Sequence, residues 1–463
     1  MTTSTLPAGA ATAPPGLLAL LVMLAGPFMV VLDFFIVNVA LPSLQHDLQA
    51  SAAALEWVVA GYGLANAALL VTGGRLGDLH GRRRLFMLGT AAFTLASAAC
   101  GLAPDAATLV LARIAQGAAG AMLQPQVIAM LSALFTGERR ARAFAAYGIA
   151  MGLAAAGGQV IGGALIEANV ASLGWRGCFL INLPIGVACL LLTPRVLPDL
   201  PGRPGSGLDV GGIVLVALTL VATVFPLVHG REHGWPAWSF ALLSGSVPLA
   251  WGFARHQRSR AAAGRPPLVP PVLWQQRRYV AGLVTTLAFF CGNASLYFVL
   301  ALYLQHGLHL SPLAAGSVFS VLAIGFFASS MLAPRTGRAL GPAALMTGAL
   351  VLAAGHAISL VLLGHVDASR IAWLLPGFLL QGWGLGMVMA PLSAAVLAGV
   401  PAEHAGVASG VMATTQQLGN ALGVALIGIL YFSAHGFGAA LGFLFVLALV
   451  VASLARRFGR MPA

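Results

Sequence analysis

Long apolar runs, separated by short polar segments, follow one another along nearly the whole chain. Each run is about 20 residues long, which is the length that a helix needs to cross the hydrocarbon core of a bilayer. The fold class predicted is an all-α polytopic membrane protein, and the short segments leave no room for a soluble catalytic domain. The runs predict fourteen transmembrane helices, at residues 17–41, 54–74, 85–103, 107–131, 143–166, 177–193, 210–229, 238–254, 280–304, 313–333, 342–363, 371–394, 406–431 and 437–455.

Composition supports the same class. Of the 463 residues, 59% are hydrophobic and 8% are charged, whereas about 25% of the residues of a soluble domain are charged. These values exclude a soluble globular protein and a disordered chain. The sequence contains no nucleophile elbow, phosphate-binding loop or cluster of metal ligands. We therefore expect no enzyme activity, no cofactor and no metal.

The charges are distributed unequally between the two sides of the predicted spans. The 24 basic residues are all arginine, and the formal net charge is +12. Twenty arginines lie on one side, three lie on the other side, and Arg113 lies inside a span. Because cytoplasmic loops carry the excess of basic residues, both termini are expected in the cytoplasm. The basic excess therefore sets topology and contacts membrane lipid, and it predicts no nucleic-acid partner.

Short matches between the two ends of the chain indicate an internal repeat. Leu44-Gln45-His46 recurs as Leu304-Gln305-His306 at an offset of 260, and Gln116-Gly117 recurs as Gln381-Gly382 at an offset of 265. We therefore expect two parallel six-helix halves, residues 17–193 and 279–455. Residues 194–278 would supply linkers and two inserted spans, and residues 1–16 and 456–463 would be cytoplasmic tails. Parallel repeats are an architecture of secondary transporters, with the substrate path between the halves.

Four local motifs carry a resemblance to a known family. They are Leu32-Asp33-Phe34-Phe35-Ile36-Val37-Asn38-Val39-Ala40-Leu41-Pro42 in the first span, Gly74-Arg75-Leu76-Gly77-Asp78-Leu79-His80-Gly81-Arg82-Arg83 after the second, Arg113 to Gln116-Gly117 in the fourth, and Gly148, Gly152, Gly157, Gly158, Gly162 and Gly163 in the fifth. Together with the repeat, they resemble the major facilitator superfamily, specifically its fourteen-spanner drug:proton antiporters. The resemblance implies the major facilitator fold, two parallel six-helix halves plus two inserted central helices. It also implies proton-coupled export of amphipathic organic compounds, drugs or a self-made metabolite, by alternating access in a bacterial cytoplasmic membrane.

Asp33 and Arg113 are the candidates for proton coupling. A carboxylate in the middle of an apolar span is costly unless it is paired, protonated or beside water, which suits a group that takes up a proton and releases it elsewhere. Arg113 lies at a similar depth, so the two can pair. The repeat offsets place Asn293 and Phe378 at the equivalent positions, which locates proton handling in the first half. The alternatives are a static polar contact for Asp33 and a permanent structural ion pair for both residues.

The remaining motif residues have gating or packing roles in this interpretation. Gly74, Asp78, Gly81, Arg82 and Arg83 are expected to form a cytoplasmic turn that resembles the superfamily's inner gate. The alternative is that these charges only set topology. The fifth-span glycines permit close helix packing, expected against the second half, and tight packing alone is their alternative role. This chain has Gly157-Gly158 where the family pattern usually has Gly-Pro.

Polar and aromatic residues within the spans are candidates for lining the substrate path. They are Phe34, Asn38, Gln116, Gln124, Gln159, Asn293, Tyr297, Gln381, Trp383 and Gln417. Lipid-facing or packing roles are the alternative for most of them. Glu56, Glu167 and His356 are secondary titratable candidates. The two glutamates lie near the outer ends of their spans, where an interfacial position is the alternative to lining an outer vestibule. A buried neutral side chain is the alternative for His356.

The expected partners are protons, a small amphipathic molecule and membrane lipid. A monomer suffices, because each chain contains both halves. Since no nucleotide site is visible, an ion gradient would supply the energy. Two rival functions remain open: a lipid-translocating or uptake transporter of the same fold, and a non-transporting membrane receptor or scaffold. The costly intramembrane Asp33 and Arg113 argue against a scaffold.

Overall fold

The computed structural model describes residues 16–202, 208–398, 400–401, 404–432 and 436–460. Residues 1–15 of the predicted N-terminal tail, residues 461–463 of the predicted C-terminal tail and residues 203–207 of the first linker therefore lie outside the described residues. The α-helices are α1 (Leu17–Leu48), α2 (Ala52–His80), α3 (Arg82–Gly101), α4 (Ala106–Leu134), α5 (Gly137–Ala168), α6 (Gly177–Leu180), α7 (Asn182–Val196), α8 (Val210–Glu232), α9 (Ala237–Ala262), α10 (Val272–Gln275), α11 (Arg277–Leu302), α12 (Pro312–Leu340), α13 (Ala344–Leu362), α14 (Leu375–Leu397), α15 (Ala405–Leu430) and α16 (Gly436–Gly459). Short 3-10 or π turns are η1 (Val170–Ser172), η2 (Gly174–Arg176), η3 (Tyr303–Gly307), η4 (Gly341–Ala343), η5 (Leu363–His365) and η6 (Ala368–Leu374).

Thirteen helical segments of the described chain are long and apolar enough to cross a membrane. They match thirteen of the fourteen predicted spans, and the sixth span is a composite of η2, α6 and α7. The remaining predicted span coincides with α15, a helix of 26 residues. It carries Gln416, Gln417 and Asn420 in its middle and is not among the thirteen. The all-helical membrane fold is confirmed, and the fourteenth crossing remains a prediction.

Several helices extend beyond the apolar runs that predict them. α1 continues to Leu48 and α12 to Leu340, because polar residues remain compatible with a helix that has left the bilayer core. The expected turn over residues 74–81 needs a correction, since α2 includes Gly74 and Asp78 and ends at His80. The reversal is made at Gly81, whose φ of 97° suits glycine and where a Cβ would come within 2.9 Å of the Leu200 carbonyl oxygen.

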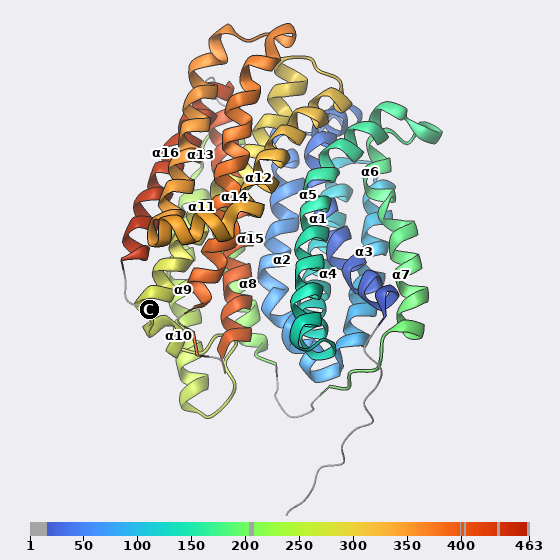
Figure 1. The fold of residues 1–463 in the computed structure, drawn as a ribbon, viewed down its shortest axis with the longest axis vertical. Helices are drawn as coiled ribbons and strands as arrows, with labels where there is room; N and C mark the ends of the chain where they lie inside the picture. Colours follow the sequence, from blue (N-terminus) through green and yellow to red (C-terminus); the bar gives the residue numbers. More distant parts are fainter. Residues whose placement is uncertain (1–15, 203–207, 399, 402–403, 433–435, 461–463) are drawn as a thin grey trace, which may run out of the picture.

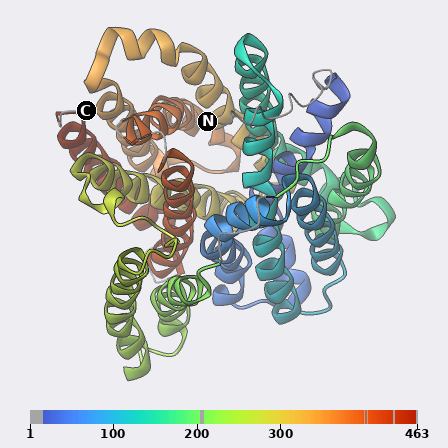
Figure 2. The ribbon, with the colours of Figure 1, turned by 90° about the horizontal axis from the view of Figure 1, so that it is seen from below.

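Two helical bundles lie side by side (Figure 1). α1–α7 form the first half, and α11–α16 form the second. Seen from below, α8 and α9 stand together outside both halves (Figure 2). α8 packs against α2 of the first half and α15 of the second, and α9 packs against α8. The inserted pair therefore contacts both halves through α8.

The halves meet along two edges. At one edge α2 packs against α15, at the other α5 packs against α12, and α1 contacts α11 between them. Glycines allow close backbone approach at the second edge. A Cβ at Gly163 would collide with the Pro312 carbonyl, and one at Gly316 would come within 2.5 Å of the Gln159 carbonyl. Small residues permit such contacts between membrane helices.

Equivalent glycines of the two halves pack in the same way. A Cβ at Gly117 of α4 would collide with the Tyr62 carbonyl of α2. A Cβ at Gly382 of α14 would likewise collide with the Leu322 carbonyl of α12. These pairs are related by the offsets of 265 and 260 that the sequence matches give. The two halves thus share their helix packing as well as their helix order.

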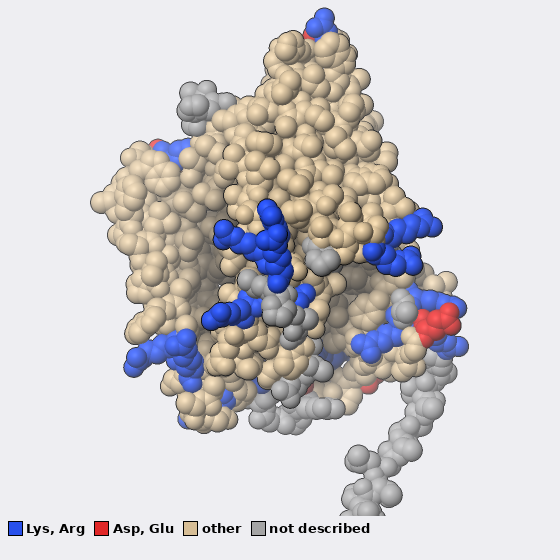
Figure 3. Space-filling view, turned by 60° about the vertical axis from the view of Figure 1, so that its left-hand side comes forward, with Lys and Arg blue, Asp and Glu red and all other residues tan. Residues whose placement is uncertain are grey.

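Basic side chains gather over the lower part of the molecule in Figure 3, and the upper part is mostly uncharged. This distribution agrees with the predicted orientation, in which the lower end faces the cytoplasm. The orientation itself remains a prediction. Below, "outer" denotes the opposite end of the helices, where α1 ends and α2 begins.

Candidate functional site

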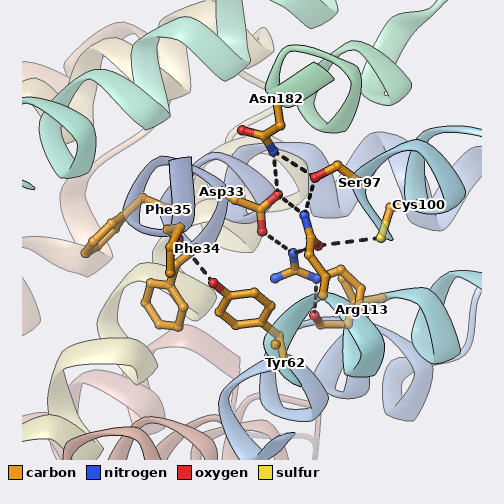
Figure 4. Close-up of polar contacts among 12 residues, drawn as sticks. Asp33, Phe34, Phe35, Tyr62, Ser97, Cys100, Arg113 and Asn182 are labelled. Carbon is orange, nitrogen blue, oxygen red and sulfur yellow. Dashed lines mark hydrogen bonds and ion pairs between the residues drawn. The ribbon is translucent and has the colours of Figure 1, made fainter. Parts of the chain in front are cut away.

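An ion pair lies in the interior of the first half. The Arg113 guanidinium of α4 contacts the Asp33 carboxylate of α1 through Nη1 and Oδ2, and both side chains have 0% exposure (Figure 4). Burying two charges costs several kcal/mol each unless they are paired and further hydrogen-bonded. This contact agrees with the expectation that the two residues lie at matching depth and can pair.

Two neutral amides complete the hydrogen bonding of Asp33, and Ser97 links them. Gln116 Nε2 donates to Asp33 Oδ1 at 2.8 Å and to Ser97 Oγ at 2.6 Å. Asn182 Nδ2 donates to the same two oxygens, at 3.1 and 3.2 Å. Gln116 Oε1 in turn accepts from Arg113 Nη1 at 2.6 Å. Side chains from four helices of the first half (α1, α3, α4 and α7) therefore form one hydrogen-bonded network around the Asp33 carboxylate (Figure 4).

Arg113 has further contacts that do not depend on Asp33. Its Nε donates to the Val58 carbonyl of α2 at 2.9 Å. The guanidinium carbon lies 4.3 Å from the centroid of the Tyr62 ring and 5.6 Å from that of Phe179, distances at which cation–π attraction operates. Its Nη2 has no hydrogen-bond partner among the described residues. Arg113 can therefore keep its place if Asp33 becomes neutral.

The sequence interpretation missed part of this site. Ser97, Asn182 and Tyr62 were not among the candidates, although each is a polar residue within an apolar run. Gln116 was expected to line the substrate path, but its side chain is buried in the first half and holds the ion pair. The signal that could have found them is depth, because each lies as far into its helix as Asp33 and Arg113 lie in theirs.

An aromatic row runs from this site across to the second half. We use "aromatic row" for Tyr62, Phe34, Phe35, Tyr297 and Phe319. Successive ring centroids are 6.2, 5.2, 4.9 and 5.7 Å apart. The step from Phe35 to Tyr297 joins α1 to α11. The two expected lining residues Phe34 and Tyr297 therefore belong to one cluster, and Phe35 and Phe319 extend it.

Buried amides lie near the junction of the halves. Gln417 Nε2 of α15 donates to Asn66 Oδ1 of α2 at 3.2 Å, which is a direct polar contact between the halves. Asn38 Nδ2 donates to the Phe34 carbonyl at 3.1 Å, while its Oδ1 has no partner among the described residues. Both side-chain atoms of the buried Gln159 are likewise unpartnered there. Gln124 and Trp383, also expected to line the path, are half-buried on α4 and α14.

The expected inner-gate charges make their described contacts within the first half and with the segment that directly follows it. Arg82 forms an ion pair with Asp78 and donates to the Gly74 carbonyl at 3.2 Å. It also donates to Oε1 of Gln126, a buried residue of α4 that the sequence interpretation missed, at 3.1 Å. Arg83 donates to the carbonyl of Leu197, beyond α7, at 2.9 Å. In this conformation the cluster joins α2, α3 and α4 to the segment that follows the sixth span.

The fifth-span glycines divide between two partners. Gly158 and Gly162 pack against α1 within the first half, so the expectation of packing against the second half is wrong for these two. Gly152 and Gly163 lie against Phe327 and the Pro312 carbonyl of α12 in the second half. Nothing in the described structure lies within 4 Å of a Cβ at Gly148, and one at Gly157 meets only Ile161 of the same helix.

The second half has the neutral part of the site without its charges. Gln381 Nε2 of α14 donates to Ser359 Oγ of α13 at 2.9 Å, as Gln116 does to Ser97. Phe378 is fully buried at the position equivalent to Arg113. Asn293, the equivalent of Asp33, is buried on α11. The ion pair is thus confined to the first half among the described residues.

The secondary titratable candidates lie in three different environments. Glu56 is fully buried at the outer edge between α2 and α15, and its Oε1 lies 2.9 Å from Arg231 Nη2. Glu167 accepts from the Ser311 hydroxyl at 2.8 Å and joins α5 to the start of α12. His356 is buried in the second half beside a small cavity, and its Nδ1 has no partner among the described residues. None of the three contacts the Asp33 site.

Comparison with known proteins decides the family. The sequence model of the Major Facilitator Superfamily matches residues 23–424, which include most of both halves. The chain belongs to the major facilitator superfamily. This major facilitator protein is a multi-span membrane transporter and not an enzyme, as the sequence analysis expected.

Curated relatives of this major facilitator protein are named for transport of an antibiotic or for antibiotic or multidrug resistance. The "Probable actinorhodin transporter" of Streptomyces coelicolor is 39% identical over 438 residues, covering 93% of this chain and 75% of that protein. "Puromycin resistance protein pur8" of Streptomyces alboniger is 39% identical, covering 88% and 80%. "Multidrug resistance protein Stp" of Mycobacterium tuberculosis is 30% identical, covering 89% and 75%.

Solved structures similar to this major facilitator protein confirm its fold. A D-xylose-proton symporter has a TM-score of 0.68 and 16% identity, covering 95% of this chain and 97% of that chain. A peptide transporter POT in complex with sulfate has a TM-score of 0.69 and 16% identity, covering 98% and 96%. At this level of identity the likeness concerns the fold alone.

Proposed function

We propose that this protein is a proton-coupled exporter of amphipathic organic compounds. It would exchange protons for substrate by alternating access of its two halves, in a bacterial cytoplasmic membrane and with both termini cytoplasmic. The relatives are named for transport of, or resistance to, antibiotics, which supports a drug or a self-made metabolite as cargo. Export, proton coupling and this orientation are parts of one proposal.

The observation that carries the proposal is the Asp33–Arg113 pair. With Asp33 ionised, the pair has no net charge. Uptake of one proton at an Asp33 carboxylate oxygen removes the anion and leaves Arg113 as an uncompensated cation. The Val58 carbonyl, the Gln116 side-chain oxygen and the Tyr62 ring remain to hold that cation. The site can therefore exist in two charge states, which is the property that a proton carrier needs.

The aromatic row supplies a link between this site and the substrate path. Phe34 contacts Tyr62, which lies over Arg113, while Phe35 contacts Tyr297 of the second half. Flat aromatic faces suit amphipathic organic molecules with conjugated rings. In the proposal, substrate binds among these rings when the halves separate on one side. Movement of Arg113 or Tyr62 would then couple the charge state of Asp33 to substrate binding.

The test is substrate-dependent proton flux in proteoliposomes that contain a pH-sensitive dye. A proton gradient is imposed, and cationic, neutral and anionic amphiphiles are added in turn. We expect proton flux with some compounds in the parent protein and a loss of at least about 100-fold in Asp33→Asn. Glu138→Gln is the matched control, because it makes the same acid-to-amide change in an exposed ion pair with Arg142.

Two results would overturn the proposal. Equal flux in the parent and Asp33→Asn proteins would remove Asp33 as the proton carrier. Substrate movement in the parent without proton movement would remove the coupling. Accumulation of substrate in everted vesicles, where the cytoplasmic face is outside, gives the direction, and efflux instead of accumulation there would contradict export.

A further inference from the structure

A second buried acid–base contact lies outside the Asp33 site, at the outer edge between the halves. Glu56 belongs to the first turns of α2, and Arg231 lies near the outer end of the inserted helix α8. Their Oε1 and Nη2 atoms are 2.9 Å apart, and the Glu56 side chain has 0% exposure. Arg231 Nη1 also donates to the Gly428 carbonyl of α15. One guanidinium therefore touches the first half, the second half and, through its own helix, the insertion.

Glycine at position 428 leaves room for this arrangement. A Cβ there would collide with the Glu56 carboxylate, which would have to move away from its present position. The Arg231 guanidinium also lies 4.9 Å from the ring centroid of Phe432, just beyond the end of α15. The outer ends of α2 and α15 are thus held together through Arg231, with Gly428 leaving the space that the carboxylate fills. We call Glu56, Arg231 and Gly428 the outer latch.

α8 has additional polar contacts with α2. Glu232 Oε1 accepts from the Ala53 N–H at 2.8 Å, and Trp57 Nε1 donates to His229 Nδ1 at 3.0 Å. The ring of Phe225 stacks on His229 at 4.5 Å and lies 6.0 Å from that of Trp57. α8 is therefore bound to the first turns of α2 by several contacts. Its described polar contact with α15 is made by Arg231.

We propose that the outer latch controls opening of the outer edge and that the inserted helix α8 takes part in transport through it. This inference rests on the proposed alternating access, because an outer opening must separate α2 from α15. In that step α8 stays with α2, and Arg231 leaves the Gly428 carbonyl and Phe432. Glu56 then holds the Arg231 guanidinium beside the first half. When the edge closes, Arg231 contacts the Gly428 carbonyl again. Glu56 and Arg231 are positioning residues in this scheme, since neither reaches the Asp33 site.

The other charged and titratable groups here are few among the described residues. Glu232 and His229 lie on α8 itself, His233 directly follows α8, and Tyr431 follows α15. Glu232 is engaged by the Ala53 N–H and His229 by Trp57. Glu56 is therefore the carboxylate placed to hold Arg231 at the edge. Its neutralisation frees Arg231 from the first half and weakens the closed outer edge.

The experiment measures outer accessibility directly, without substrate or a proton gradient. Ala421→Cys places a thiol on α15 at a buried position that faces Gly63 of α2. A membrane-impermeant maleimide is added from outside to cells, and protein without the Ala421→Cys change gives the background from the four buried native cysteines. We expect Glu56→Gln to raise the labelling rate about tenfold, a change of about 1.4 kcal/mol in the opening equilibrium.

The matched control is Asp47→Asn. Asp47 also forms an outer ion pair, with Arg176 at 2.6 Å, but both residues belong to the first half. This variant should label at the parental rate. Glu56→Asp and Arg231→Lys, which keep the charges, should lie closer to the parent than Glu56→Gln and Arg231→Gln do. A merely structural role would lower the yield of folded protein without this order of labelling rates.

Equal labelling of folded Glu56→Gln and Asp47→Asn proteins would overturn the latch. If Glu56→Gln does not fold, the Arg231→Lys and Arg231→Gln pair decides, and equal rates in these two would overturn it as well. The result is distinguishable from failure of the proposed function, because labelling needs no cargo and no proton movement. Loss of proton flux in Asp33→Asn together with unaltered labelling in Glu56→Gln would leave export standing and remove the latch.

Discussion

The two halves bury a glutamine in the same way but surround it differently. In the first half Gln116 bonds to Ser97 and also to an ionised pair, Asp33 and Arg113. In the second half Gln381 bonds to Ser359 and to the Gly355 carbonyl, and its Oε1 has no partner among the described residues. The shared glutamine–serine contact joins equivalent helices, so it belongs to the packing of the fold. Among the described residues, the buried ion pair occurs in the first half alone, and we therefore expect the first half to have the specialised role.

This difference separates two explanations for buried polarity. A hydrogen bond that recurs in both halves holds helices together. An ion pair that occurs in one half has no counterpart that packing alone would require. Replacing buried charges by apolar residues of similar size is often neutral or stabilising, so retention of Asp33 and Arg113 points to a use beyond stability.

The largest effect is expected from breaking the pair on one side only. Arg113→Met leaves the Asp33 carboxylate buried without its cation, and we expect a loss of about 3–5 kcal/mol in the free energy of unfolding. The double variant Asp33→Leu/Arg113→Met should recover most of that loss, since no charge then remains unpaired. It should still show no substrate-dependent proton flux. Denaturation midpoints of purified protein and the pH-dye assay measure the two quantities.

Phe378→Met is the matched change in the second half. It alters packing without exposing a charge, and should cost about 1 kcal/mol and preserve proton flux. Proton-coupled transport by the double variant would instead make the first-half pair a purely structural contact, and the difference between the halves would lose its functional meaning.

A smaller difference is expected between the two glutamines. Gln116→Leu removes hydrogen bonds to charged groups, which contribute about 1.5–3 kcal/mol each. Gln381→Leu removes hydrogen bonds between neutral groups, which contribute about 0.5–1.5 kcal/mol each. Gln116→Leu should therefore destabilise the protein more and should shift the pH dependence of proton flux, while Gln381→Leu should leave that pH dependence unchanged. An equal shift in both variants would show that the second half also handles protons.

Substitutions at the junction between the halves are expected to affect substrate binding rather than proton coupling. Tyr297→Leu removes the two ring contacts that link Phe35 to Phe319, each worth about 0.5–1.5 kcal/mol. We expect KM for conjugated aromatic substrates to rise about three- to tenfold with proton coupling intact. Trp383→Leu on α14 is the control and should have a smaller effect. If Trp383→Leu changes the substrate range and Tyr297→Leu does not, the aromatic row does not line the path.

Much of the fold could be predicted because apolar runs of membrane length leave few alternatives. Asp33 and Arg113 could also be predicted to pair, because two opposite charges at one depth within apolar spans have few other partners. The ends of helices could not be predicted, because polar residues beyond the bilayer are compatible with both helix and turn. α2 and α12 show this, as both continue well past their apolar runs.

Sequence periodicity could not predict the partners of Asp33 that come from other helices. Asn182 lies 149 residues from Asp33, and only the packing of α7 against α1 and α3 brings them together. Arg231 and Glu56 lie far apart along the chain, and nothing in their spacing shows that the insertion folds back onto α2. Long-range helix order decides both contacts, and a single sequence contains little information on it.

The smallest effect is expected for Asp209, in the segment between the halves. Its charge lies at the start of a helix rather than in the bilayer. Asp209 precedes α8 and accepts from the Gly212 N–H at 2.9 Å, His256 Nε2 at 2.7 Å and Gln257 Nε2 at 2.8 Å. Burial alone would raise the pKa of Asp209, but the hydrogen bonds from His256, Gly212 and Gln257 outweigh burial and hold its pKa below the ordinary value. The ionised form is therefore the one that stabilises the fold.

A carboxyl with a lowered folded pKa stabilises the protein fully above its unfolded pKa, about 3.9 for aspartate. This contribution is lost as the pH falls through the lowered folded value. Asp209→Asn should reduce the free energy of unfolding by about 1–2 kcal/mol at pH 7, and the difference from the parent should shrink below about pH 4. Thermal unfolding of both proteins at pH 7 and pH 3 measures it. A difference that grew on acidification would reverse the sign and show that Asp209 is held protonated. Unlike Asp33→Asn, this variant should keep proton flux at neutral pH, because a capping charge outside the bilayer stabilises the insertion without taking part in the exchange of protons.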